Sequence, residues 1–189
     1  MPYLGNHDVT RVEENGKSRI DTVYYQIPEF EGTDQKGRKL SSHDLDSSVY
    51  IADFFFTTCP SYCPRLTGSM ERIEEQFGKV KDFRLVSFSV DPDHDNVPAL
   101  ADYGKLHHAD PDKWFFVRVE KNKLHDLAMN FLVIPPDSTP DMKSKDIPHS
   151  PYFILVDKKR HIRGMYDGNN PTSVDSLMGD LRYLLKSYR

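Results

Sequence analysis

Hydrophobic residues fall into short runs along the chain, and the spacing within each run predicts the element that it forms. Runs rich in β-branched and aromatic residues predict strands at 49–56, 84–90, 114–119, 151–157 and 161–167. The run at 49–56, VYIADFFF, is almost continuously apolar, which is typical of a strand buried on both faces of a sheet. The aromatic groups FFF and WFF are therefore expected to lie in the core.

Helical spacing separates several of these strands. Apolar residues three and four positions apart predict helices at 67–77, 99–107, 122–131 and 172–188. Alternating strands and helices, then two strands joined by a short turn and a last helix, predict an α/β fold with parallel crossovers and an antiparallel closing hairpin. The proline-rich stretch at 133–150 is expected to be a surface loop.

The beginning of the chain has a different pattern. Residues 1–20 are polar and predict an arm, which leaves a single domain at 21–189. The segment TVYYQIPEF, at 22–30, is strand-like, and 31–40 predicts a hairpin that turns at 34–37. Ser41 or Ser42 is expected to cap a short helical turn that ends at Leu45.

Composition narrows the class of protein. The 189 residues include 25 Lys and Arg against 29 Asp and Glu, a formal net charge of −4, which argues against a nucleic-acid or anionic-membrane partner. No apolar run approaches the roughly 18 residues of a membrane helix, and the polar start has no signal-peptide core. Taken literally, this predicts a soluble cytosolic protein, although a chain shortened at its N-terminus would have the same pattern.

The chain contains two cysteines, Cys59 and Cys63, spaced C-x-x-x-C between a predicted strand and a predicted helix. At a helix N-terminus the free N–H groups and the helix dipole favour thiolates, which are both nucleophiles and metal ligands. Two thiolates suit a soft ion such as Cu(I), or Zn(II) with further ligands, and the same pair could close a disulfide. Two inert core cysteines are the alternative, but the turn-forming residues around them disfavour it. A cysteine pair that leads from a central strand into a helix is typical of a thioredoxin-like sheet.

A third metal ligand would most naturally be an imidazole. Most of the eight histidines are expected to be solvated surface residues. His149 differs because it precedes the strand at 151–157, and in a thioredoxin-like sheet the loop before that strand faces the cysteines. His94, in the acidic turn DPDHD, is the second choice. The acidic turn itself, like the run DMKSKD, is interpreted as a solvated loop.

Three segments, DFFFTTCPSYCPRLTGSM, VSFSVDPDHDNVPALADYGK and HSPYFILVDKKRHIRGMYDG, together resemble the Sco/SenC family. These are copper-binding, thioredoxin-like proteins involved in cytochrome c oxidase assembly, and the resemblance covers nearly everything from Thr22 onward. It implies a central mixed sheet flanked by helices, with an N-terminal β-hairpin extension. It also implies that Cys59, Cys63 and His149 bind copper, as Cu(I) or Cu(II), and that Asp91 lies near the metal. The family pattern usually has Asp before the histidine, where this chain has Pro148.

The resemblance further implies a metallochaperone that delivers copper to cytochrome c oxidase or matures its copper site. Its partner would be the copper-bearing oxidase subunit or another copper chaperone. Family members are normally held by an N-terminal membrane anchor on the periplasmic side of the cell membrane or in the mitochondrial intermembrane space. Such an anchor is absent from this chain.

Other functions remain open for the same cysteines. A thiol–disulfide oxidoreductase would use Cys59 and Cys63 as its redox pair. A peroxiredoxin-like peroxidase fits less well, because Phe56 and Ala52 stand where its P-x-x-x-T-x-x-C motif needs Thr and Pro. A structural zinc site normally has four ligands, and no fourth candidate stands out.

Overall fold

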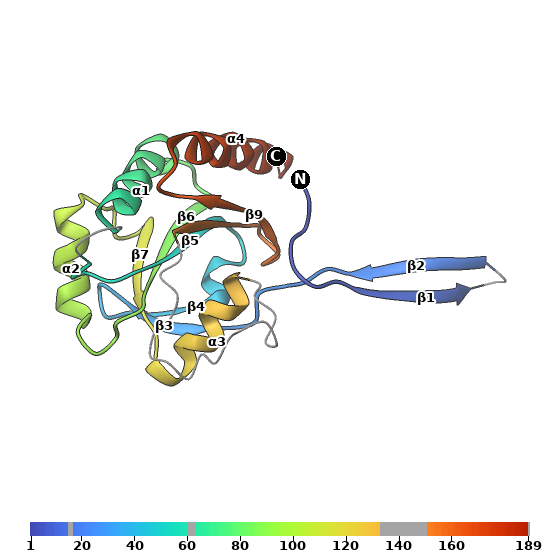
Figure 1. Ribbon diagram of the computed structural model, residues 1–189, viewed down its shortest axis with the longest axis horizontal. Coiled ribbons are helices and arrows are strands. Elements are labelled where there is room, and N and C mark those ends of the chain that lie inside the picture. Colours follow the sequence, from blue (N-terminus) through green and yellow to red (C-terminus); the bar gives the residue numbers. More distant parts are fainter. Residues whose placement is uncertain (15–16, 60–62, 133–150, 189) are drawn as a thin grey trace.

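The structure is a computed structural model that describes residues 1–14, 17–59, 63–132 and 151–188 (Figure 1). Its centre is a mixed sheet of seven strands in the order β4-β3-β7-β6-β5-β8-β9. The strands are β3 Glu31–Asp34, β4 Lys39–Ser41, β5 Val49–Phe55, β6 Phe83–Ser89, β7 Trp114–Arg118, β8 Tyr152–Val156 and β9 Ile162–Asp167. Strands β5, β6 and β7 are parallel, whereas β8 pairs with β5 and β3 pairs with β7 in the antiparallel sense. The predicted α/β class is confirmed.

In the described part of the chain, four helices cover the two faces of this sheet, and η1 Ser42–Leu45 is a short 3-10 turn. The helices are α1 Cys63–Phe77, α2 Val97–Leu106, α3 Lys121–Leu132 and α4 Pro171–Ser187. Helices α1 and α4 lie side by side on one face, and α3 lies on the other (Figure 1). The four predicted helices are therefore confirmed, with α1 beginning four residues earlier than its apolar spacing indicated.

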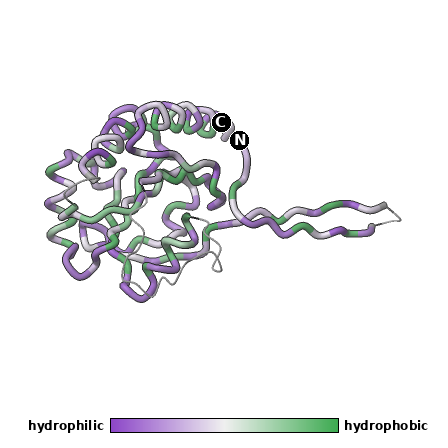
Figure 2. Tube along the Cα trace, in the orientation of Figure 1, coloured by the Kyte–Doolittle hydropathy of each residue, from purple (hydrophilic) through white to green (hydrophobic). Residues whose placement is uncertain are grey.

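Strand β5 shows why the central run is apolar throughout. Every one of its residues is buried, because successive side chains point to opposite faces and both faces are covered. Ile51 and Phe55 join the core under α1 and α4, while Tyr50 and Phe54 join the core under α3. Hydrophobic residues are concentrated accordingly in the middle of the molecule (Figure 2).

The hairpin predicted at 31–40 is present as β3 and β4. Gly37 has φ of +75°, and its N–H donates to the Asp34 carbonyl oxygen at 2.9 Å, which closes the turn. Ser41 occupies the N-cap position of η1, and both its N–H and its hydroxyl bond the Asp44 carboxylate.

The prediction of one strand at 22–30 is wrong beyond Val23. This segment crosses from the N-terminal hairpin to the sheet and buries only single side chains, Ile27 and Phe30, in the core under α3. Pro28 has no N–H to donate to a strand ladder, and the Ile27 N–H instead donates to the Arg160 carbonyl oxygen at 2.9 Å.

Before this segment, β1 Asp8–Glu14 and β2 Lys17–Val23 form a two-stranded antiparallel hairpin that extends away from the domain (Figure 1). The chain before it returns to the domain, where Leu4 bridges Ile162 of β9. None of the helices in the described part of the chain has both the length and the apolar character needed to cross a membrane.

Candidate metal centre

The parallel strands β5 and β6 end at the same edge of the sheet, and the segments that follow them carry the predicted site residues. The Val90 N–H donates to the Phe55 carbonyl oxygen at 2.8 Å, so the two segments leave the sheet side by side. After β5 the chain passes through Thr57 to Cys59, and α1 begins at Cys63. In open α/β sheets, sites form outside the carboxyl ends of the strands, and this edge is such a place.

Cys59 lies in the segment between β5 and α1. Its N–H donates to the Phe56 carbonyl oxygen at 3.3 Å, and its half-buried side chain packs against the core under α1. Cys63 is the first residue of α1, whose first turn contains no acidic residue. The start of a helix carries a positive potential from its dipole, and this potential favours thiolates. The predicted position of the pair at a helix N-terminus agrees with the structure.

A buried carboxylate holds the cysteine segment against the turn that follows β6. Asp95 is fully buried, and its carboxylate accepts hydrogen bonds from the Thr57 N–H at 3.2 Å and the Thr57 hydroxyl at 2.5 Å. It also accepts one from the Ser89 hydroxyl at 2.6 Å. The interpretation of the acidic turn as a solvated loop is wrong for Asp95, because its side chain is buried and its carboxylate is hydrogen-bonded inside the protein.

Asp91 lies at the start of the same turn and is half-buried. Its carboxylate bonds the Nδ1 of His94 at 2.8 Å, and its N–H donates to the Ser89 hydroxyl at 3.1 Å. The hydrogen bond to Asp91 raises the pKa of His94, whose exposed imidazole is thereby favoured in the protonated form. A hydrogen bond from one ring nitrogen to a carboxylate is also the usual arrangement of metal-bound histidines, so His94 keeps its place as the second choice.

His149, the preferred third ligand, lies outside the described residues, as does the whole stretch predicted to be a surface loop at 133–150. The chain re-enters the structure at Pro151, and β8 starts at Tyr152. Because β8 runs antiparallel to β5, with Ile154 opposite Ala52, it starts beside the end of β5 that leads to Cys59. Within the described ranges, no three His, Cys, Asp or Glu side chains gather as a metal site would require.

One buried acid near this edge, Asp53, was not among the candidate residues that the sequence indicated. Asp53 of β5 is fully buried, and burial raises its pKa to about 7, while a hydrogen bond from Ser87 lowers it in part. Ser87 in turn accepts the Trp114 indole N–H at 2.9 Å. The signal was present in the sequence, because an acid within the apolar run VYIADFFF is expected either to find partners or to stay neutral.

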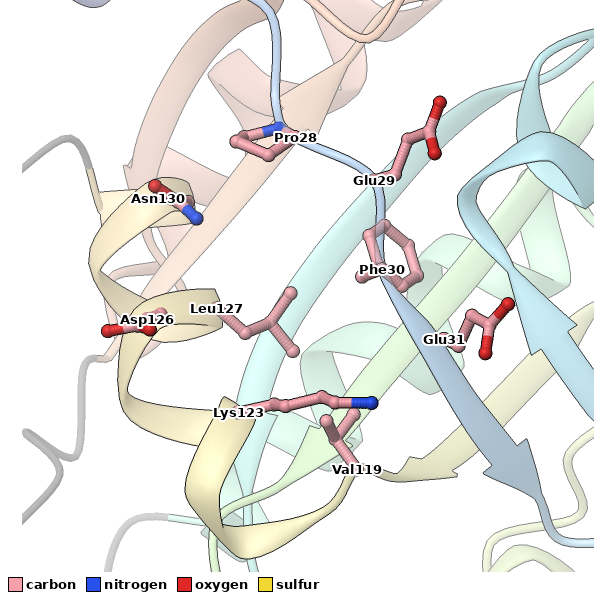
Figure 3. A pocket seen from close by; sticks show the side chains of 9 residues that line it. All are labelled: Pro28, Glu29, Phe30, Glu31, Val119, Lys123, Asp126, Leu127 and Asn130. Atoms are coloured by element: carbon pink, nitrogen blue, oxygen red, sulfur yellow. The ribbon is translucent and has the colours of Figure 1, made fainter.

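A hollow of about 190 Å³ lies elsewhere, between α3 and the segment that precedes β3 (Figure 3). Its floor is formed by Phe30, Val119 and Leu127, which belong to the core under α3, the sheet face opposite to Cys59. Its rim carries charges of both signs, including Glu29 and Lys123. Ligand pockets usually exceed about 300 Å³, so this hollow is not a strong candidate for the functional site.

Comparison with known proteins shows which family the chain belongs to. The SCO1/SenC family model matches residues 21–186, which include both cysteines, the acidic turn and all but the final residue of the last helix. The chain belongs to the SCO1/SenC family. The SCO1 protein homolog of Bacillus subtilis (strain 168) is 27% identical over 170 residues, covering 88% of this chain and 86% of the homolog.

Solved structures of Sco proteins share the fold of this SCO1/SenC family member, which is thioredoxin-like. BsSco, a member of the Sco family of cytochrome c oxidase assembly proteins studied for a disulfide switch, matches with a TM-score of 0.71 at 24% identity, covering 86% of this chain and 94% of BsSco. A SCO1/SenC family lipoprotein from Bacillus anthracis str. Ames matches with a TM-score of 0.71 at 25% identity, covering 85% and 95%. Arabidopsis thaliana ScoI with copper bound matches with a TM-score of 0.67 at 21% identity, covering 87% and 100%.

Proposed function

We propose that this SCO1/SenC family member is a copper metallochaperone that delivers copper to cytochrome c oxidase or matures its copper site. The observation that carries the proposal is the placement of Cys59 just before α1 and of Cys63 at its first residue, at the edge of the sheet where β8 begins. Relatives support it, because Sco proteins are cytochrome c oxidase assembly proteins and one has been solved with copper bound.

The proposed ligands are the thiolates of Cys59 and Cys63 and the imidazole of His149. Two thiolates suit Cu(I), and an added imidazole also suits Cu(II). His149 stands two residues before Pro151 in the sequence, and β8, which follows, starts beside this edge, which supports His149 as the third ligand. Asp91 is proposed to lie near the metal without binding it, because its carboxylate is engaged with His94.

We propose that the acceptor is the copper-bearing subunit of the oxidase or another copper chaperone, and that it takes the ion by exchange of thiolate ligands. A location on the periplasmic side of the membrane, with an N-terminal anchor in the full-length protein, is proposed as well. The SCO1/SenC lipoprotein from Bacillus anthracis supports an anchored form in this family.

Metal titration of the reduced protein tests the proposal. We expect one copper ion per chain, with affinity reduced by about a hundredfold or more in Cys59→Ser and Cys63→Ser, because each removes a thiolate. His149→Ala is expected to weaken Cu(II) more than Cu(I). Competition with a chromophoric chelator measures Cu(I) affinity, and the thiolate-to-copper absorption band follows Cu(II).

His94→Ala is the matched control, since it removes the exposed imidazole that was the second choice. It is expected to bind both ions like the unaltered protein. Equal copper binding by His149→Ala and the unaltered protein would contradict the proposed ligand set, and binding that survives both cysteine substitutions would contradict the site.

A thiol–disulfide oxidoreductase is the second candidate function, and the disulfide switch of BsSco is the observation that favours it. Reduced Cys59 and Cys63 would give two electrons and two protons to a partner disulfide and form a disulfide themselves. Efficient reduction of a model disulfide, by a protein that fails to bind copper, would favour this function over the metallochaperone.

A further inference from the structure

The N-terminal hairpin has features that are typical of a protein–protein interface, and the described part of the domain does not cover it. Its strands β1 and β2 form a separate two-stranded sheet, and neither outer edge pairs with another described strand. Ile20 and Val9 lie on one face of it and are 66% and 65% exposed. A two-stranded hairpin with exposed aliphatic residues is marginally stable in water and gains from a third strand.

Contacts at its base hold this hairpin in a defined direction. Tyr3 precedes β1 and Tyr24 follows β2, and their rings stack with centroids 4.1 Å apart. The Arg163 guanidinium lies 4.2 Å from the centre of the Tyr3 ring and donates to the carbonyl oxygens of Met1 and Pro2. The hairpin is therefore presented by the domain rather than attached through a loose tail.

The outer edge of β2 is complementary to itself. Arg19, Ile20 and Asp21 stand at the middle of Lys17–Val23 in the order cation, aliphatic, anion. In an antiparallel pair of two β2 strands related by a two-fold axis at Ile20, each Ile20 faces its own copy. Each Arg19 then faces an Asp21, and all seven residues of the strand are paired.

We propose that the β2 edge of the hairpin binds the same edge of a second copy of this chain, so that the two hairpins form one four-stranded sheet. Charged side chains on an exposed strand usually prevent edge-to-edge pairing, because the pairing of two identical strands tends to place like charges opposite each other. Here the two-fold axis brings opposite charges together. Arg19 and Asp21, whose side chains are 64% and 59% accessible, form an ion pair with each other at 3.8 Å within the strand, and in the dimer each also faces the opposite charge of the second copy.

The edge of β1 is a poorer candidate for the same pairing. A two-fold axis at Val12 would set Arg11 opposite Glu13, but only the five residues 10–14 would pair, because β1 ends at Glu14. An axis at Arg11, the centre of the strand, would place two arginines opposite each other. The number of residues that pair and the charges that face each other both favour the β2 edge over the β1 edge for this dimer.

Charge reversal with rescue tests this dimer in the full 189-residue chain. Sedimentation velocity over a series of concentrations is expected to show a monomer–dimer equilibrium. Arg19→Asp alone and Asp21→Arg alone are each expected to weaken the dimer by about tenfold or more, since each sets like charges opposite each other twice. The double variant Arg19→Asp/Asp21→Arg restores both opposite-charge pairs and is expected to restore the dimer.

Arg11→Asp, on the other strand of the same hairpin, is the matched control and is expected to leave the dimer unchanged. Circular dichroism and thermal midpoints check that the variants fold, which is expected because the hairpin lies outside both cores. A protein that stays monomeric at every concentration would overturn the proposal. So would open-ended oligomers, failure of the double variant to restore the dimer, or equal weakening by Arg11→Asp.

Cross-linking locates the two-fold axis. In a Cys59→Ser/Cys63→Ser background, Ile20→Cys is expected to give a covalent dimer with a short bis-maleimide, because residue 20 of one copy faces residue 20 of the other. Val9→Cys, on the distant strand of the same face, is expected to react at least about tenfold less. Equal yields from the two positions, or no dimer from Ile20→Cys, would place the contact elsewhere.

Discussion

Asp53 illustrates how a single residue can be strongly constrained by its surroundings without belonging to the proposed ligand set. Its side chain is fully buried under α1, where it has the Ser87 hydroxyl as a partner, and Oδ1 has no hydrogen bond in the described structure. Burial raises its pKa to about 7, so the folded protein keeps a proton that an unfolded chain loses near pH 4. The stability of the protein should therefore fall as the pH rises from about 4 to 7, because only the folded state must hold the proton or bury a charge.

Asp53→Asn is expected to remove this pH dependence. The amide is neutral at every pH, so the variant should match the unaltered protein near pH 4 and exceed its free energy of unfolding by on the order of 2 kcal/mol at pH 8. Urea unfolding at the two pH values measures the difference. Asp102→Asn, which changes an exposed acid, is the control and should leave the pH dependence intact. An unchanged dependence in Asp53→Asn would show that Asp53 is ionised in the folded state.

At the scale of elements, the site depends on how the ends of β5 and β6 are held together. β5 and β6 are joined by parallel strand pairing up to Phe55 and Ser89. Beyond this point, hydrogen bonds to the Asp95 carboxylate join the segments that follow the two strands. Asn96 next to it caps α2 by accepting the Ala99 N–H at 3.0 Å. One short turn therefore starts a helix and fixes the segment that carries Cys59.

Asp95→Ala is expected to lower the free energy of unfolding by about 3 kcal/mol, because it leaves the Thr57 and Ser89 donors without a buried partner. It is also expected to weaken copper binding by about tenfold, since the Cys59 segment loses its support. Asp93→Ala in the same turn is the control, because Asp93 is exposed and pairs with the exposed Lys121. Chemical denaturation and copper competition measure the two effects, and equal losses in both variants would contradict a special role for Asp95.

At the scale of the whole molecule, the start of the chain is held against β9. The side chains of Arg163 and Asp157 are only 11% and 2% exposed and form an ion pair with 2.9 Å between Nη1 and Oδ2. The same guanidinium donates hydrogen bonds to the carbonyl oxygens of Met1 and Pro2 and lies over the ring of Tyr3. This pair therefore supports both the closing strands of the sheet and the base of the N-terminal hairpin.

Arg163→Met is expected to lower the free energy of unfolding by about 3 kcal/mol, because Asp157 would remain buried without its cation. Arg72→Met removes a partner from the exposed ion pair with Asp175 and is expected to change stability by less than about 1 kcal/mol. Thermal and urea unfolding compare the two variants. Similar effects of the two substitutions would mean that the buried ion pair contributes no more to the free energy of unfolding than a surface ion pair.

Local patterns predicted most of the elements correctly, because each of them depends on residues that are close in sequence. The apolar run at β5, the turn at Gly37, the cap at Ser41 and the apolar face of α4 are of this kind. The segment 22–30 was predicted incorrectly, since its strand-like composition reflects burial of single side chains under α3. The placement of His149 remains a prediction, because it lies outside the described residues.

The sequence by itself determined the α/β class, the cysteine pair before a helix and the resemblance to copper-binding proteins, since these are properties of spacing and residue type. Tertiary structure decided which polar residues are buried. Asp53 and Asp95 look like ordinary acids in the sequence. Only the covering helices and the adjacent strand ends raise the pKa of Asp53 to about 7 and give the Asp95 carboxylate its hydrogen bonds to Thr57 and Ser89. The physical reason is that desolvation and hydrogen bonding depend on neighbours far away in the chain, which a pattern of nearby residues does not contain.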